Sequence, residues 1–188
     1  GPWRHRAHCL AEMGQMDAAL ADARQCLALT PQDASSHALL ARLLVQAGHM
    51  ETAAQAFVQA QALAPEDEGL AAMALDAWLL VPGREAEAVA LAVQMASRWP
   101  MSQAQARKVL RVVTLTDEGA ARAQQFWQGV LACPHPPDWA WSGYAEHLLA
   151  LGRWEEATVH AMAWMQAAPD ASAPQETLAR LLTARGDF

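Results

Sequence analysis

Apolar residues recur along the chain at spacings of three and four positions, the pattern of helices that bury one face. One such stripe lies in residues 3–10 and a second in residues 19–27. Between them stands Gly14, which can adopt the positive φ of a tight turn because it has no Cβ. Pro31 follows the second stripe and ends it, since proline lacks a backbone N–H. This segment therefore predicts two helices joined by a short turn.

The same order of features returns every 34 or 35 residues. Prolines mark the period at Pro31, Pro65, Pro100, Pro134 and Pro169, and turn glycines mark it at Gly14, Gly48, Gly83, Gly152 and Gly186. A fixed period of this length indicates a repeat protein, in which each helix pair buries its apolar face against the next. We therefore expect an all-α fold with repeats of approximately 2–31, 32–65, 66–100, 101–134 and 135–169, and a closing helix in a partial repeat 170–188.

Small residues occupy matching positions in the first two repeats, Ala7 and Ala19 in one and Ala41 and Ala53 in the other. In these positions, as in its period, the chain resembles the tetratricopeptide repeat family, whose unit is a helix–turn–helix of 34 residues. The resemblance covers nearly the whole chain. It implies a single right-handed superhelical solenoid of antiparallel helix pairs over residues 1–188. The first helix of each pair would then form the concave wall.

Two regions depart from the regular pattern. Residues 81–84 lengthen the turn of the third repeat, and the first helix of that repeat fits more than one register. In the fourth repeat Thr116, Asp117 and Glu118 replace the glycine turn with a signal for a helix N-terminus. Four repeats also carry a large apolar residue two positions after the glycine, which we interpret as a hydrophobic plug: Met16, Met50, Trp154 and Phe188.

The composition disfavours some kinds of binding partner and indicates the kind of organism from which the protein comes. The net charge of −7 disfavours nucleic-acid binding, which needs a basic face. No apolar run approaches the ~20 residues needed to cross a bilayer, so we expect no membrane span. Gly1-Pro2 resembles the remnant of a cleaved tag, and the chain has twelve arginines, one lysine, no isoleucine and no asparagine. We expect a fragment of a larger, bacterial protein.

Three cysteines cannot all pair with one another, which favours a reducing compartment over an oxidising one. On this ground we favour a cytoplasmic location and keep a periplasmic one as the alternative. The nearest approach to a metal site is His5, His8 and Cys9, because His5 and Cys9 lie one helical turn apart. A structural zinc site usually needs four ligands, so we expect ordinary helix-face residues here and no metal. Cys9 and Cys26 are more simply small core residues.

No catalytic motif is present: the chain has no Gly-rich phosphate loop, no H-E-x-x-H and no G-x-S-x-G. We therefore expect neither an enzyme nor a cofactor. The family resemblance instead implies a peptide-binding groove on the concave wall. Carried onto this sequence, the groove residues are Arg4, His8, Arg42, Arg107, Arg111, Ser142, Glu146 and Arg180.

Four of these groove residues are arginines in the first four repeats, which favours an acidic partner because Arg makes bidentate bonds to carboxylate or phosphate. The simpler interpretation is that solvated helix faces carry arginines in any case. Some relatives clamp chaperone tails with Lys and Asn, but this chain has only Lys108 and no asparagine. Trp139 is either a groove anchor or a residue packed under the proline-rich connector, and the sequence favours the second.

These observations predict a non-catalytic scaffold that binds a peptide or protein segment in its concave groove. Two alternatives stay open. The chain could be the substrate-presenting arm of a larger enzyme such as a glycosyltransferase, or a periplasmic scaffold in polysaccharide export or outer-membrane assembly. The sequence makes no prediction of the oligomeric state.

Overall fold

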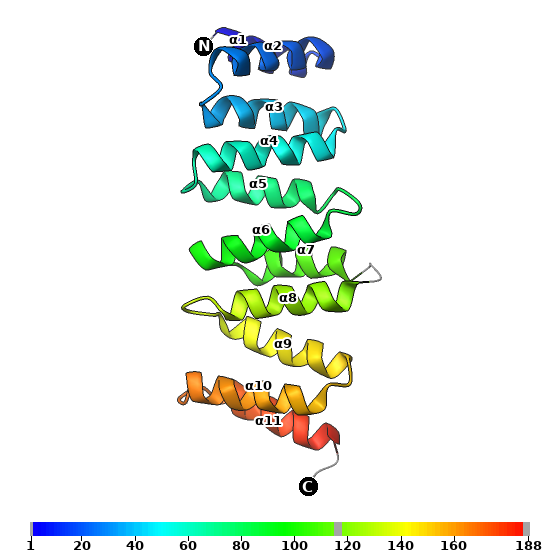
Figure 1. Cartoon of the computed structure of the whole chain (residues 1–188), viewed down its shortest axis with the longest axis vertical. Coiled ribbons are helices and arrows are strands. Elements are labelled where there is room, and N and C mark those ends of the chain that lie inside the picture. Colours follow the sequence, from blue (N-terminus) through cyan, green and yellow to red (C-terminus); the bar gives the residue numbers. More distant parts are fainter. Residues whose placement is uncertain (1, 115–117, 186–188) are drawn as a thin grey trace. The chain divides into compact units, whose positions relative to one another are not determined.

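The computed structural model of the protein describes residues 2–114 and 118–185 (Figure 1). Over these residues it consists of eleven α-helices and no strand, as the sequence predicts. The chain divides into two compact units, Gly1–Met95 and Ala96–Phe188. The first contains α1 (Pro2–Glu12), α2 (Met16–Leu29), α3 (Ala34–Gln46), α4 (Met50–Leu63), α5 (Glu68–Trp78) and most of α6 (Glu85–Arg98). The second contains α7 (Gln103–Val113), α8 (Gly119–Leu131), α9 (Asp138–Ala150), α10 (Trp154–Ala167) and α11 (Ser172–Arg185).

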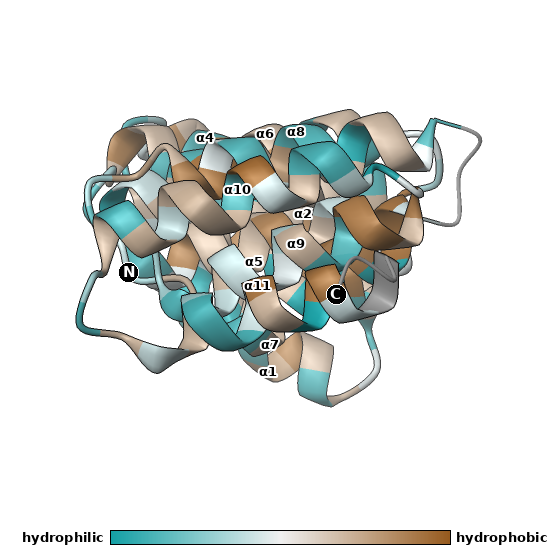
Figure 2. Cartoon of the chain, turned by 90° about the horizontal axis from the view of Figure 1, so that it is seen from below, coloured by the Kyte–Doolittle hydropathy of each residue, from teal (hydrophilic) through white to brown (hydrophobic). Residues whose placement is uncertain are grey.

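The helices come in pairs whose bounds follow the predicted period. Within the first unit, α1 packs on α2, α2 on α3, α3 on α4 and α4 on α5. Within the second, α7 packs on α8, α8 on α9, α9 on α10 and α10 on α11. Individual helices such as α10 and α11 carry both hydrophilic and hydrophobic residues, as Figure 2 shows. None of the helices in the described part of the chain combines the length and apolarity needed to cross a bilayer. The right-handed winding stays a prediction.

The short turns have the conformation that the glycines predict. Gly48 has φ +81°, and a side chain is strained in this region. Its N–H donates to the carbonyl of Val45 (3.0 Å), and the N–H of His49 donates to that of Leu44 (2.8 Å). This pair of bonds is the Schellman motif that ends a helix. Gly14 and Gly152 repeat it with φ +73° and +70°. The sequence repeat is therefore a repeat of turn geometry.

Some helix starts are marked by side chains that the sequence analysis did not single out. Asp33 precedes α3 and accepts a hydrogen bond from the N–H of Ser35 (3.2 Å). Asp67 caps α5 by accepting from the N–H of Leu70 (3.1 Å). In the fourth repeat the predicted N-terminal signal at Thr116 and Asp117 lies outside the described residues. There α8 follows Glu118, which makes no side-chain cap bond.

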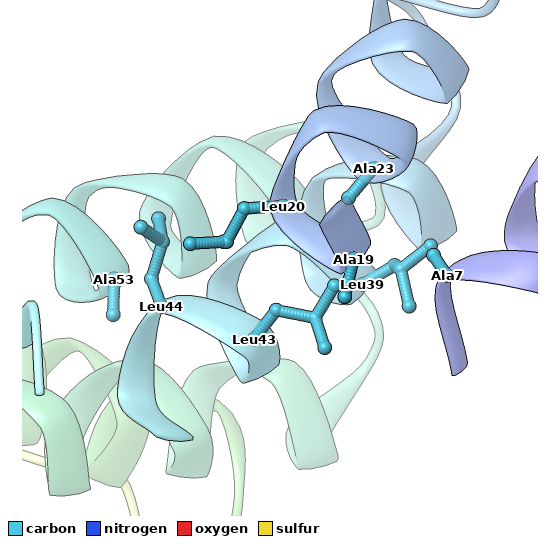
Figure 3. Packing of buried hydrophobic residues seen from close by; sticks show 8 residues of the cluster. All are labelled: Ala7, Ala19, Leu20, Ala23, Leu39, Leu43, Leu44 and Ala53. Carbon is cyan, nitrogen blue, oxygen red and sulfur yellow. The ribbon is translucent and has the colours of Figure 1, made fainter. Parts of the chain in front are cut away.

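The core of the first unit is built on alanines (Figure 3). Ala7, Ala19, Ala23 and Ala53 are fully buried, and the leucines around them complete the cluster: Leu20, Leu39, Leu43 and Leu44. Small side chains let helix axes approach closely, so these positions set the spacing between α1, α2, α3 and α4. The burial of Ala7, Ala19, Ala41 and Ala53 confirms the small-residue positions.

Two details of the predicted packing differ. Cys26 is buried as expected, but Cys9 lies half-exposed on α1 and is not a core residue. The plug residues Met16, Met50 and Trp154 are half-buried, and Phe188 lies outside the described residues. Their place at the start of the second helix, next to the turn, leaves one side open to solvent. They cover the edge of the core and do not fill it.

The second unit is packed with aromatic side chains. Phe126 and Trp164 are 0% and 2% exposed, and Trp141 stacks on Trp164 with ring centroids 6.3 Å apart and planes 5° apart. Trp127 runs under Gly143 of α9, where a Cβ would come within 2.3 Å of its ring. Gly143 is therefore needed for space, because the ring occupies the position that any side chain would take.

Candidate functional site

Two adjoining pockets open on the first helices of the pairs in the first unit. The first has a volume of about 490 Å³ and is lined by Arg4, His5 and His8 of α1 and by Leu39, Arg42, Leu43 and Gln46 of α3. The second, of about 330 Å³, is lined by Arg42, Val45 and Gln46 of α3, Phe57 of α4, Met73, Asp76 and Ala77 of α5, and Leu80. Arg42 and Gln46 line both pockets. We call the two together the unit-1 groove.

Helical spacing explains why one helix can supply so much of this surface. The residues that α3 contributes lie three, four and seven positions apart, which places them on one face. The opposite face of α3 contributes Leu44, which packs against the alanines of the core. The same helix therefore holds the repeat together on one side and lines the unit-1 groove on the other.

Arg4 is fixed at the edge of the unit-1 groove by the cap of α3. Its Nη2 donates to Asp33 (2.5 Å) and to the hydroxyl of Ser36 (3.3 Å). Hydrogen bonds from Ser35, Ser36 and Arg4 lower the pKa of Asp33 from 3.8 to about 2. The carboxylate is thus charged at neutral pH and offsets the charge of Arg4. Arg4 lines the pocket, but it does not supply the free positive charge that the sequence suggested.

Arg42 differs from Arg4 because it is exposed and makes no ion pair or hydrogen bond to another described residue. It stands between two surfaces of different chemistry. On one side lie the basic and histidine side chains of α1, and no carboxylate lines that pocket. On the other lies an apolar surface that includes Phe57, Met73 and Leu80. An anionic group and an apolar group of one ligand could both reach the surroundings of Arg42.

The second unit has a pocket of its own between α7 and α9, of about 300 Å³, which we call the unit-2 pocket. It is lined by Gln103, Ala106, Arg107 and Leu110 of α7, Trp127 of α8, and Trp139, Ser142, Gly143 and Glu146 of α9. Trp127 and Trp139 form its aromatic part, with ring centroids 6.3 Å apart. Arg107 and Glu146 are both exposed, and neither forms an ion pair within the described residues.

The structure gathers six of the eight predicted groove residues around these pockets. Arg4, His8 and Arg42 line the unit-1 groove, and Arg107, Ser142 and Glu146 line the unit-2 pocket. Arg111 on α7 and Arg180 on α11 are exposed but line neither. That any of these residues binds a peptide stays a prediction.

Sequence reasoning missed the apolar half of the unit-1 groove and misplaced Trp139. Phe57 and Met73 belong to apolar stripes and read as core residues, although they also form a pocket wall. Trp139 lies half-buried in the wall of the unit-2 pocket against Trp127, whereas we had favoured packing under the connector. Its spacing of three and seven positions from Ser142 and Glu146 places it on the same face of α9 as those predicted groove residues.

No group of three or more His, Cys, Asp or Glu side chains in the described part of the chain is arranged to hold a metal ion. His8 instead lies 3.3 Å from Glu12, one turn along α1.

Residues 3–33 and 34–67 each match the model of the tetratricopeptide repeat. No curated protein matches the chain.

Several solved structures match the chain at low identity, two of them of tetratricopeptide repeat proteins. A thermophilic one from Thermus thermophilus is 20% identical with a TM-score of 0.45, over 97% of this chain and 98% of that one. One from Parabacteroides merdae is 16% identical with a TM-score of 0.43, over 96% and 70%. The pilF protein of Pseudomonas aeruginosa is 17% identical with a TM-score of 0.46, over 99% and 84%. Similarity at this level carries no argument about function.

Proposed function

We propose that this chain, whose residues 3–33 and 34–67 match the tetratricopeptide repeat model, is a scaffold that binds a segment of a protein partner in the unit-1 groove. Tetratricopeptide repeats typically serve protein interaction and not catalysis. The partner segment that fits best carries an acidic side chain next to a large apolar one. The acidic group would contact Arg42, and the apolar group would enter the pocket beside it.

The observation that carries the proposal is the position of Arg42, shared by both pockets and unpaired within the described residues. An arginine that already has a carboxylate partner, as Arg4 has in Asp33, must lose that partner before it binds another. Arg42 meets no such penalty and can form a bidentate bond to a carboxylate.

Affinity and selectivity would come from different halves of the groove. An exposed ion pair contributes only about 0.2–1 kcal/mol, so Arg42 alone cannot hold a partner. Burial of a large apolar side chain contributes about 1.5–3 kcal/mol, which makes the pocket at Phe57, Met73 and Leu80 the anchor. Arg42 would then decide which apolar segments are accepted. Because the groove is built on packed helices, most of the ordering cost falls on the partner.

Charge reversal tests this assignment. Arg42→Glu is compared with Arg24→Glu, a matched control at an exposed arginine of α2 that lines no pocket described above. Both variants are first shown to equal the unaltered protein in helicity and thermal midpoint. Partners captured by the unaltered protein from an extract of the source cells are identified, purified and titrated against all three proteins.

We expect Arg42→Glu to weaken binding at least about tenfold, since it removes one attraction and adds one repulsion. The Arg24→Glu control should bind as the unaltered protein does. A photo-crosslinker placed at Gln46, which lines both pockets, should also capture the partner, whereas one at Gln25 of α2 should not. Unchanged binding by Arg42→Glu, or crosslinking from Gln25 alone, would contradict the proposal.

The two alternatives from the sequence use the same surface. An arm that presents substrates to an enzyme and a periplasmic scaffold would each hold a protein segment in the unit-1 groove. They differ in the partner, so the captured protein decides between them: an acceptor substrate favours the first, and an envelope assembly component favours the second.

A further inference from the structure

The unit-2 pocket contains a cation and an anion that face the same space without pairing. Arg107 belongs to α7 and Glu146 to α9, and both line the pocket. Neither makes a salt bridge with the other or with any other described residue. On surfaces where opposite charges lie close together, they usually pair. A ligand that carries both charges could enter between them and satisfy each.

The two walls of the unit-2 pocket differ in hydrogen-bonding character. Ser142 directs its hydroxyl proton to the carbonyl of Trp139 (3.2 Å) or Asp138 (3.3 Å) within its own helix, so its oxygen faces a ligand as an acceptor. Glu146 on the same wall is also an acceptor. Arg107 on the α7 wall can only donate. The pocket therefore has an accepting wall on α9 and a donating group on α7.

The aromatic part of the pocket adds to the accepting wall. Trp139 belongs to α9, seven positions before Glu146, so both lie on one face of the helix. The face of an indole ring attracts cations by about 0.5–2 kcal/mol. A basic side chain could then place its charged end at Glu146 and its aliphatic part along Trp139. An acidic side chain gains nothing from this wall and would bind only at Arg107.

We propose that the unit-2 pocket is a second recognition subsite, which binds a mixed-charge segment of the partner, with a basic side chain against Glu146 and Trp139 and a neighbouring acidic side chain against Arg107. This deepens the proposed function and rests on it. The first pocket of the unit-1 groove favours carboxylates because none lines it, whereas Asp76 lines the second. The unit-2 pocket rejects purely acidic segments, because Glu146 would repel them.

Peptide probes can test the subsite without knowledge of the natural partner. Four synthetic peptides share one Gly/Ser/Leu framework and carry at the same positions only Glu, only Lys, alternating Lys and Glu, or only Gln. Each is titrated into the ¹⁵N-labelled full chain, and the indole N–H signals of its eight tryptophans are followed by NMR. The variants are Glu146→Gln, with Glu155→Gln of α10 as its matched control, and Arg107→Gln, with Arg24→Gln as its control.

We expect the alternating peptide to shift the Trp139 signal and to bind at least about fivefold more tightly than the Gln peptide, as one partly enclosed ion pair provides. Glu146→Gln and Arg107→Gln should each remove most of this preference, and their controls should retain it. If the Glu146→Gln variant still binds the alternating peptide more tightly than the Gln peptide to the same degree, the proposal is wrong. An alternating peptide that leaves the Trp139 signal unshifted would overturn it as well.

The test separates this subsite from the proposed function through the Glu peptide. If that peptide binds in an Arg42-dependent manner while the alternating peptide shows no dependence on Glu146, the subsite is wrong and the unit-1 groove stands. If neither Arg42→Glu nor Glu146→Gln changes the binding of any peptide, both assignments are wrong. Absence of all binding in these titrations also counts against both.

Discussion

The two units share one repeat but fill it with different side chains. In the first unit, alanines at 0% exposure hold the helices together, as at Ala7, Ala19 and Ala53. In the second, rings do much of this work, and Phe126 and Trp164 are its largest fully buried side chains. The match to the tetratricopeptide repeat model ends at residue 67, within the first unit. The helix–turn–helix geometry therefore persists where the side-chain pattern no longer matches.

This difference in packing extends to the surface. Alanine has no reach beyond the core, so the unit-1 groove shares only larger residues with the core, such as Leu39 and Leu43. Trp127 is long enough to belong both to the core of the second unit and to the wall of the unit-2 pocket. Its ring lies where Gly143 leaves room for it. A change at the shared core residues should therefore alter the pocket in both units, through leucines in the first and through an indole ring in the second.

The largest effect should follow removal of the most buried ring. Trp164→Ala leaves a cavity in the second unit and should lower the free energy of unfolding by about 3–5 kcal/mol. Trp164→Phe should lower it much less, because the indole N–H of Trp164 is buried without a partner and its loss breaks no hydrogen bond. Urea unfolding measures both values, and hydrogen exchange of the full chain shows which helices lose protection.

In Trp164→Ala we expect the loss of hydrogen-exchange protection to fall on α9, α10 and α11, which pack on one another. Equal destabilisation by Trp164→Phe and Trp164→Ala would contradict the prediction, because it would mean that the N–H and not the ring volume matters. Loss of protection centred on α1 to α4 would contradict the assignment of separate cores to the two units.

A smaller effect should distinguish two uses of glycine. Gly48→Ala places a side chain at φ +81° in open space, and the left-handed conformation costs about 1–2 kcal/mol. Gly143→Ala has no such backbone problem, but its Cβ would lie 2.3 Å from the ring of Trp127, and overpacking costs about 1–3 kcal/mol. Similar losses of stability are thus expected for unrelated reasons.

A double-mutant cycle with Trp127→Leu separates the two reasons. The smaller side chain should relieve part of the loss caused by Gly143→Ala and none of that caused by Gly48→Ala, because only residues in contact couple. Urea midpoints of the single and double variants provide the coupling energy. Zero coupling at Gly143 would contradict the close approach of α9 to Trp127.

The sequence predicted the helix pairs well because their causes are local. The turn at Gly48 forms because glycine can adopt a positive φ. The helix ends near Pro31 because proline lacks a backbone N–H. The burial of Ala19 follows from its position in the repeat. Each of these follows from one residue and its near neighbours. The helix bounds therefore follow the period of 34 or 35 residues, even in the second unit.

The candidate site was less predictable because it depends on contacts between helices. Arg4 and Arg42 lie on the groove face of successive first helices, yet Asp33 pairs with Arg4, whereas Arg42 has no partner among the described residues. Only the path of the chain between α2 and α3 brings Asp33 to Arg4. Trp139 shares its helix face with Ser142 and Glu146 by spacing, but its contact with Trp127 could not be predicted, since Trp127 comes from the preceding repeat.

The smallest effect concerns acid, which should weaken the two units in different pH ranges. In the second unit, His160 donates from Nε2 to the carbonyl of Trp141 (2.9 Å) and stacks on the ring of Trp141. Burial lowers the pKa of His160 below its ordinary 6.5, and the carbonyl of Trp141 only partly opposes this. Below pH about 6.5 the unfolded chain therefore binds this proton more readily, and the second unit loses stability as the pH falls.

In the first unit the corresponding group is Asp33, whose pKa is lowered from 3.8 to about 2. Its contribution is fully present above 3.8 and is lost as the pH falls towards about 2. Hydrogen exchange of the full chain between pH about 7 and about 5, corrected for the intrinsic rate, should therefore show falling protection in α9 and α10 and constant protection in α3. His160→Gln should reduce this difference and leave the part due to His147 of α9, whose pKa burial also lowers, whereas His135→Gln, at an exposed histidine of the connector, should keep it in full. If protection fell equally in α3 and α10 over this pH range, the two units would unfold as one. The difference in packing between them would then have no separate effect on stability.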